Sequence, residues 1–163
     1  MSGITVGIDG SAHSSHVLEW ALKEGAIRHA PVTVLTVHSV PMDGWTGNPI
    51  RLPRDAADEE SECQAAEELT AKALSQLGDA QPPSVTVRAT IGFPAQELIE
   101  ASRTADLMVV GSRGAGGFAR LVIGSVSSQV VHHAHCPVVV LRNESLGCAP
   151  WPAVPARTAG PVV

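Results

Sequence analysis

The stretch LMVVGSRGAGGFARLVIGS, residues 107–125, joins an apolar run to a cluster of glycines with two arginines and no acidic residue. Its first five residues, LMVVG, are typical of a strand that is buried on both faces of a parallel sheet. Glycine loses more backbone entropy on folding than any other residue, so the cluster that follows requires a reason. That reason is either turn geometry or a ligand.

Strand and helix patterns alternate outward from this stretch. Strands are predicted over residues 1–9, 32–40, 84–91, 107–111 and 136–142. Helices are predicted between them, over residues 13–29, 56–77 and 94–103 and on an apolar face made by Val126, Val130, Val131 and Ala134. This β-α-β-α-β-α-β-α-β order predicts an α/β fold, in which one parallel sheet carries helices on both faces.

Composition narrows the class of protein. The 163 residues suit one domain, and with 44% hydrophobic but only 3% aromatic residues the core must consist mainly of Val, Leu, Ile and Ala. The net charge of -5 argues against nucleic acid or an anionic membrane as the main partner. No apolar run approaches the roughly 20 residues that span a bilayer, and no leader pattern opens the chain.

Two further features concern location and domain limits. Three cysteines at wide spacing, Cys63, Cys136 and Cys148, indicate reduced thiols, so we expect a soluble, cytoplasmic protein. Residues 1–142 are expected to form the folded domain. Residues 143–163 are rich in Pro, Ala and Gly and are expected to be a flexible tail, while residues 41–55 predict a long connection.

The glycine cluster was compared with three phosphate-binding patterns. A Walker-type loop needs a lysine after its last glycine, and neither Lys23 nor Lys72 follows one. The dinucleotide fingerprint is met only loosely, by Gly114, Gly116 and Ala119, and lacks the acid that would hold a ribose about 20 residues later.

The third pattern has wider spacing. Gly111 and Gly114 let main-chain N–H groups approach an anion, and Gly124-Ser125 places the free N–H groups of a helix start nearby. No Asp or Glu occurs from residue 107 to 143, whereas Arg113, Arg120 and Arg142 do. The segment therefore favours an anion site, although a flexible surface loop would explain the glycines equally simply.

A resemblance to a known family rests on these residues. The segment from Val109 to Arg142 resembles the carboxyl half of the universal stress protein family, whose nucleotide-binding members carry G-2x-G-9x-G-[ST], and VGIDGS at residues 6–11 is similar to the family's start. The resemblance covers residues 1–142. It implies a five-stranded, doubly wound sheet of order 3-2-1-4-5 that binds ATP across the ends of the first, second and fourth strands.

The resemblance also implies roles for individual residues. Asp9 would face the ribose or a phosphate-bound Mg²⁺, Gly7 would leave room for the nucleotide, and main-chain groups from Val37 to Ser39 would meet the adenine edge. The residues that would surround the phosphates are Gly111, Arg113, Gly114, Gly124, Ser125 and Val126. Simpler roles remain open, because Asp9 and Ser125 are both suited to turns and helix caps.

The function implied is that of an ATP-binding stress-response regulator whose nucleotide occupancy modulates its dimer state or its contacts with an unidentified regulatory partner. The homodimer would form through the last strand, from Pro137 to Arg142. One alternative is a slow ATPase or nucleotidyl transferase, for which we assign no catalytic residues. Another is a stress factor that acts through protein contacts alone. His132, His133 and His135 do not have the spacing of a metal site, so none is assigned.

Overall fold

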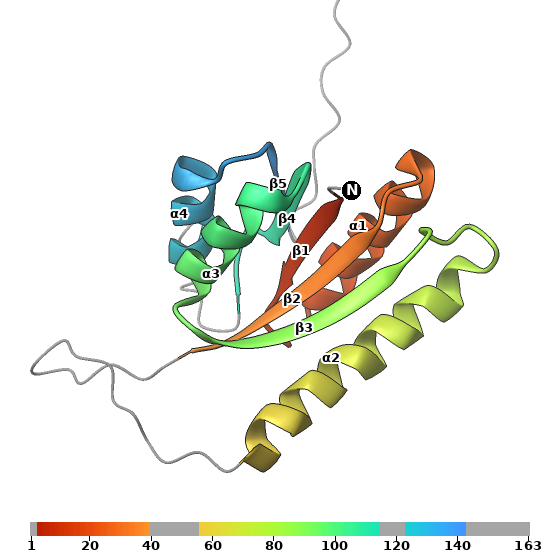
Figure 1. Cartoon of the computed structure of the whole chain (residues 1–163), viewed down its shortest axis with the longest axis horizontal. Coiled ribbons are helices and arrows are strands. Elements are labelled where there is room, and N and C mark those ends of the chain that lie inside the picture. Colours follow the sequence, from red (N-terminus) through yellow and green to blue (C-terminus); the bar gives the residue numbers. More distant parts are fainter. Residues whose placement is uncertain (1–2, 40–55, 115–122, 143–163) are drawn as a thin grey trace, which may run out of the picture.

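The computed structural model describes residues 3–39, 56–114 and 123–142, and these form a five-stranded parallel sheet of order β3-β2-β1-β4-β5 (Figure 1). The strands are β1 (Ile4–Ile8), β2 (Val32–Ser39), β3 (Val85–Gly92), β4 (Leu107–Gly111) and β5 (Val138–Leu141). The helices are α1 (Ser14–Arg28), α2 (Ala56–Leu77), α3 (Pro94–Ala101) and α4 (Ser125–His133), with a short 3₁₀ turn at Ser102–Thr104. The predicted fold class and strand order are confirmed.

Strand β4 joins the two halves of the core. Leu107 and Val109 pack in the cluster that α1 and α2 cover, while Met108 and Val110 pack in the cluster on the side of α3 and α4. None of these four side chains is more than 5% exposed. The apolar run is therefore buried on both faces, because successive residues of a strand point to opposite sides of the sheet.

Helix α1 follows the predicted pattern closely. Its buried face consists of Ser14, Val17, Leu18, Ala21, Leu22 and Gly25. The helix ends at His29, which adopts the left-handed conformation with φ of 51° and whose N–H bonds to the carbonyl of Ala26. Pro31 follows this turn and leads into β2.

Helix α4 differs from the prediction at one position. Val130 is fully buried, and Val126 and Ala134 pack partly against the same cluster. Val131, however, is 46% exposed, so its predicted place on the buried face is wrong. The next residue along a helix lies about 100° further round the axis, which turns Val131 away from the sheet while Ser127 faces inward.

Several sequence predictions fall outside the described residues, namely the long connection at 41–55, the glycine loop at 115–122 and the tail at 143–163. Within the described part of the chain, no helix has both the length and the apolar character that crossing a bilayer requires.

The Ser102 side chain links the end of α3 to the segment that leads into β5 through two hydrogen bonds. Its side chain is 1% exposed, and its hydroxyl donates to the Ile99 carbonyl (2.6 Å) while accepting a bond from the His135 N–H (2.8 Å). Two segments more than 30 residues apart in sequence thus share one buried hydroxyl.

We expect Ser102→Ala to lower the free energy of unfolding by about 1–3 kcal/mol, because it leaves the His135 N–H without its acceptor. Thr104→Ala, in the same turn but exposed, should change the stability by less than about 0.5 kcal/mol. Urea unfolding of both variants measures the difference, and equal effects would contradict the role given to Ser102.

Candidate functional site

A crevice of about 980 Å³ opens at the carboxyl ends of β1, β2 and β4. Here the chain order of the sheet reverses, since β2 and β3 lie on one side of β1 and β4 and β5 on the other. Ligands of doubly wound sheets bind at such a switch point, in pockets of roughly 300–1,000 Å³. All ten residues predicted from the sequence line this crevice: Gly7, Asp9, Val37, Ser39, Gly111, Arg113, Gly114, Gly124, Ser125 and Val126.

The end of β1 forms one wall through a hydrogen-bonded turn. Asp9 Oδ1 accepts bonds from the Ser11 N–H (3.1 Å) and the Ser14 hydroxyl (2.9 Å), and Ser14 Oγ accepts the Asp9 N–H (3.2 Å). Gly10 has a φ of 71°, the left-handed conformation that glycine adopts without strain. Asp9 therefore shapes the Asp-Gly-Ser turn, as its simpler predicted role requires, while its carboxylate stays exposed at the crevice.

The loop after β4 comes close to this carboxylate. A Cβ on Gly114 would lie 2.5 Å from Asp9 Oδ2, so a side chain there would require the Asp9 carboxylate to move. Glycine at this position thus leaves the carboxylate its place at the crevice.

The start of α4 is held against the end of β4. The Gly124 N–H donates to the Ser112 carbonyl (2.7 Å), and the Ser127 hydroxyl donates to the Gly111 carbonyl (2.6 Å). The two ends of the glycine-rich segment therefore meet, although residues 115–122 between them are not described.

Helix α4 directs its first amides at the crevice. The Ser128 N–H bonds back to the Gly124 carbonyl (2.9 Å) as the first helical hydrogen bond. The amides of Ser125, Val126 and Ser127 precede it and have no acceptor within the helix, as at every helix start. All three residues line the crevice, and Gly124 places no side-chain cap over them.

The glycines of the crevice have different reasons to be glycine. A Cβ on Gly7 would lie 2.7 Å from Leu98 Cδ2, so packing against α3 restricts this position. At Gly124 the nearest atom to an added Cβ among the described residues is the Ser112 carbonyl oxygen at 3.5 Å, an ordinary contact, and φ is -73°. The described residues therefore leave room for a Cβ at Gly124.

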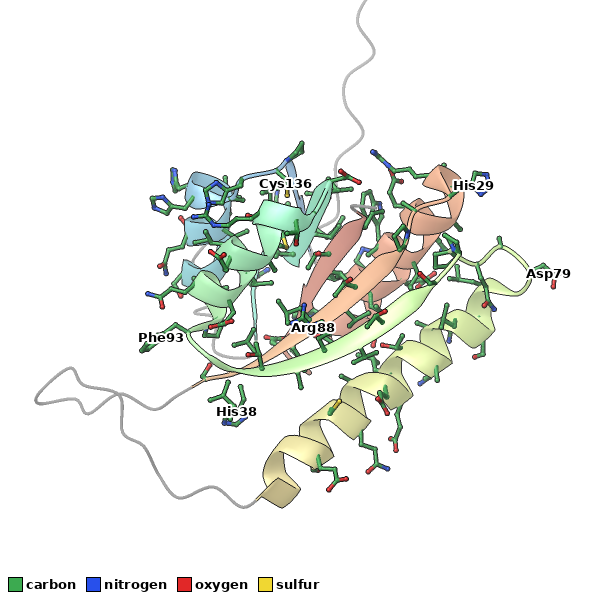
Figure 2. All side chains as sticks on the ribbon, in the orientation of Figure 1. His29, His38, Asp79, Arg88, Phe93 and Cys136 are labelled. Atoms are coloured by element: carbon green, nitrogen blue, oxygen red, sulfur yellow. The ribbon has the colours of Figure 1, made fainter. Side chains whose placement is uncertain are left out.

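The end of β2 supplies the remaining wall. Val37, His38 and Ser39 line the crevice together, and Figure 2 shows the His38 side chain where β2 ends. Across from them, Ala65, Ala66 and Leu69 of α2 complete the wall. The sequence carries no local signal for these α2 residues, because only tertiary packing brings the helix there.

Ser11 is a site residue that was not predicted from the sequence, although it belongs to the motif VGIDGS at residues 6–11. It lines the crevice, and its Oγ is buried without a hydrogen-bond partner among the described residues. A buried hydroxyl usually has a partner, and the described residues do not supply one here.

Comparison with known proteins agrees with this architecture. The family model described as the universal stress protein family matches residues 1–142. The chain belongs to the universal stress protein family. A universal stress protein of Mycolicibacterium smegmatis is 32% identical over 142 residues, which cover 87% of this chain and 48% of the relative. The chain thus spans about half the length of the curated relatives it matches.

Solved universal stress protein structures share the fold. One, in complex with cAMP, has a TM-score of 0.62 at 23% identity and covers 86% of this chain and 96% of its own. Another, from Archaeoglobus fulgidus in complex with dAMP, has a TM-score of 0.55 at 22% identity and covers 86% and 97%.

We expect Ser14→Ala to cost about 1–2 kcal/mol of unfolding free energy, because the buried hydroxyl makes both bonds to Asp9. Ser15→Ala, at the exposed neighbouring position, should leave the stability unchanged or slightly higher, since Ala favours the helix. Thermal or urea unfolding compares the two, and a tolerated Ser14→Ala would show that the Asp9 turn does not depend on this hydroxyl.

Proposed function

We propose that this universal stress protein binds ATP in the crevice and that nucleotide occupancy regulates its part in a stress response. One observation carries the proposal, namely that the first amides of α4 open onto the crevice behind a glycine at which the described residues leave room for a side chain. Such amides, together with the helix dipole, favour a bound phosphate.

The residues present fit the phosphate end of a nucleotide. Ser125, Val126 and Ser127 offer main-chain N–H groups, and the buried Ser11 hydroxyl offers another donor. Arg113, half-buried on the same wall, adds positive charge. Together they form a donor set for phosphate oxygens, which only accept hydrogen bonds.

The residues also suit the nucleoside end. The end of β2 exposes main-chain groups of Val37 and Ser39, and apolar side chains such as Leu35 and Leu98 line the neighbouring wall. Relatives of the same fold were solved with cAMP and dAMP, which supports an adenine nucleotide as the class of ligand. Asp9 is assigned to the ribose or to a Mg²⁺ ion on the phosphates, because carboxylate oxygens suit that ion.

Regulation through a dimer is part of this proposal. Strand β5 forms an edge of the sheet, and its four residues Val138–Leu141 are all only half-buried. An apolar edge strand of this kind favours pairing with another chain, so we assign the homodimer interface to the segment from Pro137 to Arg142.

Cys63 and Cys136 are free thiols, which supports a cytoplasmic location.

Two variants at Gly124 test the proposal without disturbing the fold. Asp and Asn are both favoured at a helix N-cap, and the described residues leave room for their Cβ. Both variants should therefore fold at least as stably as the parent protein. Only Asp adds a negative charge beside the phosphates.

Isothermal titration calorimetry with MgATP should show the tightest binding for the parent protein and weaker binding for Gly124→Asn. Gly124→Asp should lose a further factor of about ten or more in affinity, because like charges repel. Equal affinities for the three folded proteins would contradict the proposed site. If the parent protein neither binds MgATP nor melts at a higher temperature with it, the proposed function is wrong.

A further inference from the structure

A second, smaller hollow lies between the start of α1 and the ends of β4 and β5. It is lined by His13, His16, Arg113 and Arg142, with Val17 and Leu141 among its apolar neighbours. We name it the α1–β5 hollow. Half of its lining is shared with the crevice, namely His13, Val17, Gly111 and Arg113. The other half lines the hollow alone, namely His16, Ser112, Leu141 and Arg142.

The ionisable side chains of the lining are all basic. Two arginines and two histidines come from three separate segments of the chain, and no Asp or Glu is among the described residues that line the hollow. Arg113 is half-buried, and Arg142 and His16 are exposed. In a protein of net charge -5, this concentration of basic side chains favours an anion.

Main-chain hydrogen bonds hold the hollow in shape. The Ser112 N–H donates to the Leu141 carbonyl (2.7 Å), and the Ser112 carbonyl accepts the Gly124 N–H (2.7 Å). Ser112 itself is 3% exposed. These bonds fix the backbone beside Arg113 against the backbone beside Arg142.

The size of the hollow limits the ligand. Its volume is about 10 Å³, which is room for one water-sized group. A small oxyanion could insert one oxygen there and keep its other oxygens at the mouth, within reach of the arginines and imidazoles. We propose that the α1–β5 hollow is a second anion site, which binds a tetrahedral oxyanion of the sulfate and phosphate class beside the nucleotide crevice, with which it shares Arg113.

Glu19 on α1 and Asp9 at the end of β1 are not among the residues that line the hollow. Glu19 is bonded to Lys23, whose hydrogen bond and charge lower the pKa of the Glu19 carboxyl. Asp9 lines the crevice instead.

Sulfate is the suitable probe, because it is a tetrahedral dianion near neutral pH. Sodium sulfate is titrated into the ¹⁵N-labelled full chain, with sodium chloride at equal ionic strength as the control. We expect the amides of Ser112 and Leu141 to shift saturably with sulfate and not with chloride.

Matched variants locate the site. Arg142→Gln and His16→Gln should each weaken sulfate binding about threefold or more, whereas Arg88→Gln on β3 and His132→Gln on α4, both exposed and outside the hollow, should not. All four positions are exposed or at the mouth, so the amide spectra should remain those of the folded chain. Equal responses to chloride, or equal losses in the control variants, would mean an adventitious ion only.

A last variant separates this proposal from the proposed function. Gly124→Asp adds a negative charge to the crevice, and Gly124 does not line the hollow. The sulfate response should persist in it. Loss of the response in Gly124→Asp would place the sulfate in the crevice and overturn the second site, while failure to bind ATP with an intact sulfate response would overturn only the nucleotide proposal.

Discussion

Burial of β4 between two layers of helices is the constraint that positions both sites. Its four apolar side chains fill the cores on either face, and each contributes about 1.5–3 kcal/mol relative to exposure. The chain can leave this strand only at Gly111, at the edge where β1 also ends. Ser112 then joins that exit to both β5 and α4 through its main-chain hydrogen bonds. A packing requirement in the interior thus determines where polar groups meet at the surface.

Much of this arrangement can be predicted from the sequence. The run LMVVG predicts a strand covered on both sides, and the alternation of strands and helices predicts the parallel sheet. The order of the strands came from the family resemblance rather than from the patterns. Gly111, Gly114 and Gly124 also fall where their spacing places them, around one crevice.

Other features depend on contacts that no local pattern encodes. Val131 has the spacing of a buried residue, but Ser127 occupies the inward position of α4 instead. The wall from α2 depends on how that helix packs, and the unpartnered hydroxyl of Ser11 is visible only in three dimensions. Glycines likewise look alike in a sequence. An added Cβ would meet Leu98 at Gly7 and the Asp9 carboxylate at Gly114, whereas at Gly124 no described residue lies so close.

The central claim is that the opening amides of α4 hold the phosphates of a nucleotide. A crystal structure of the protein grown with MgATP tests it most directly. The account predicts phosphate oxygens at hydrogen-bond distance, about 2.7–3.2 Å, from the main-chain nitrogens of Ser125 or Val126. A nucleotide bound elsewhere, with only water at the start of α4, would contradict it.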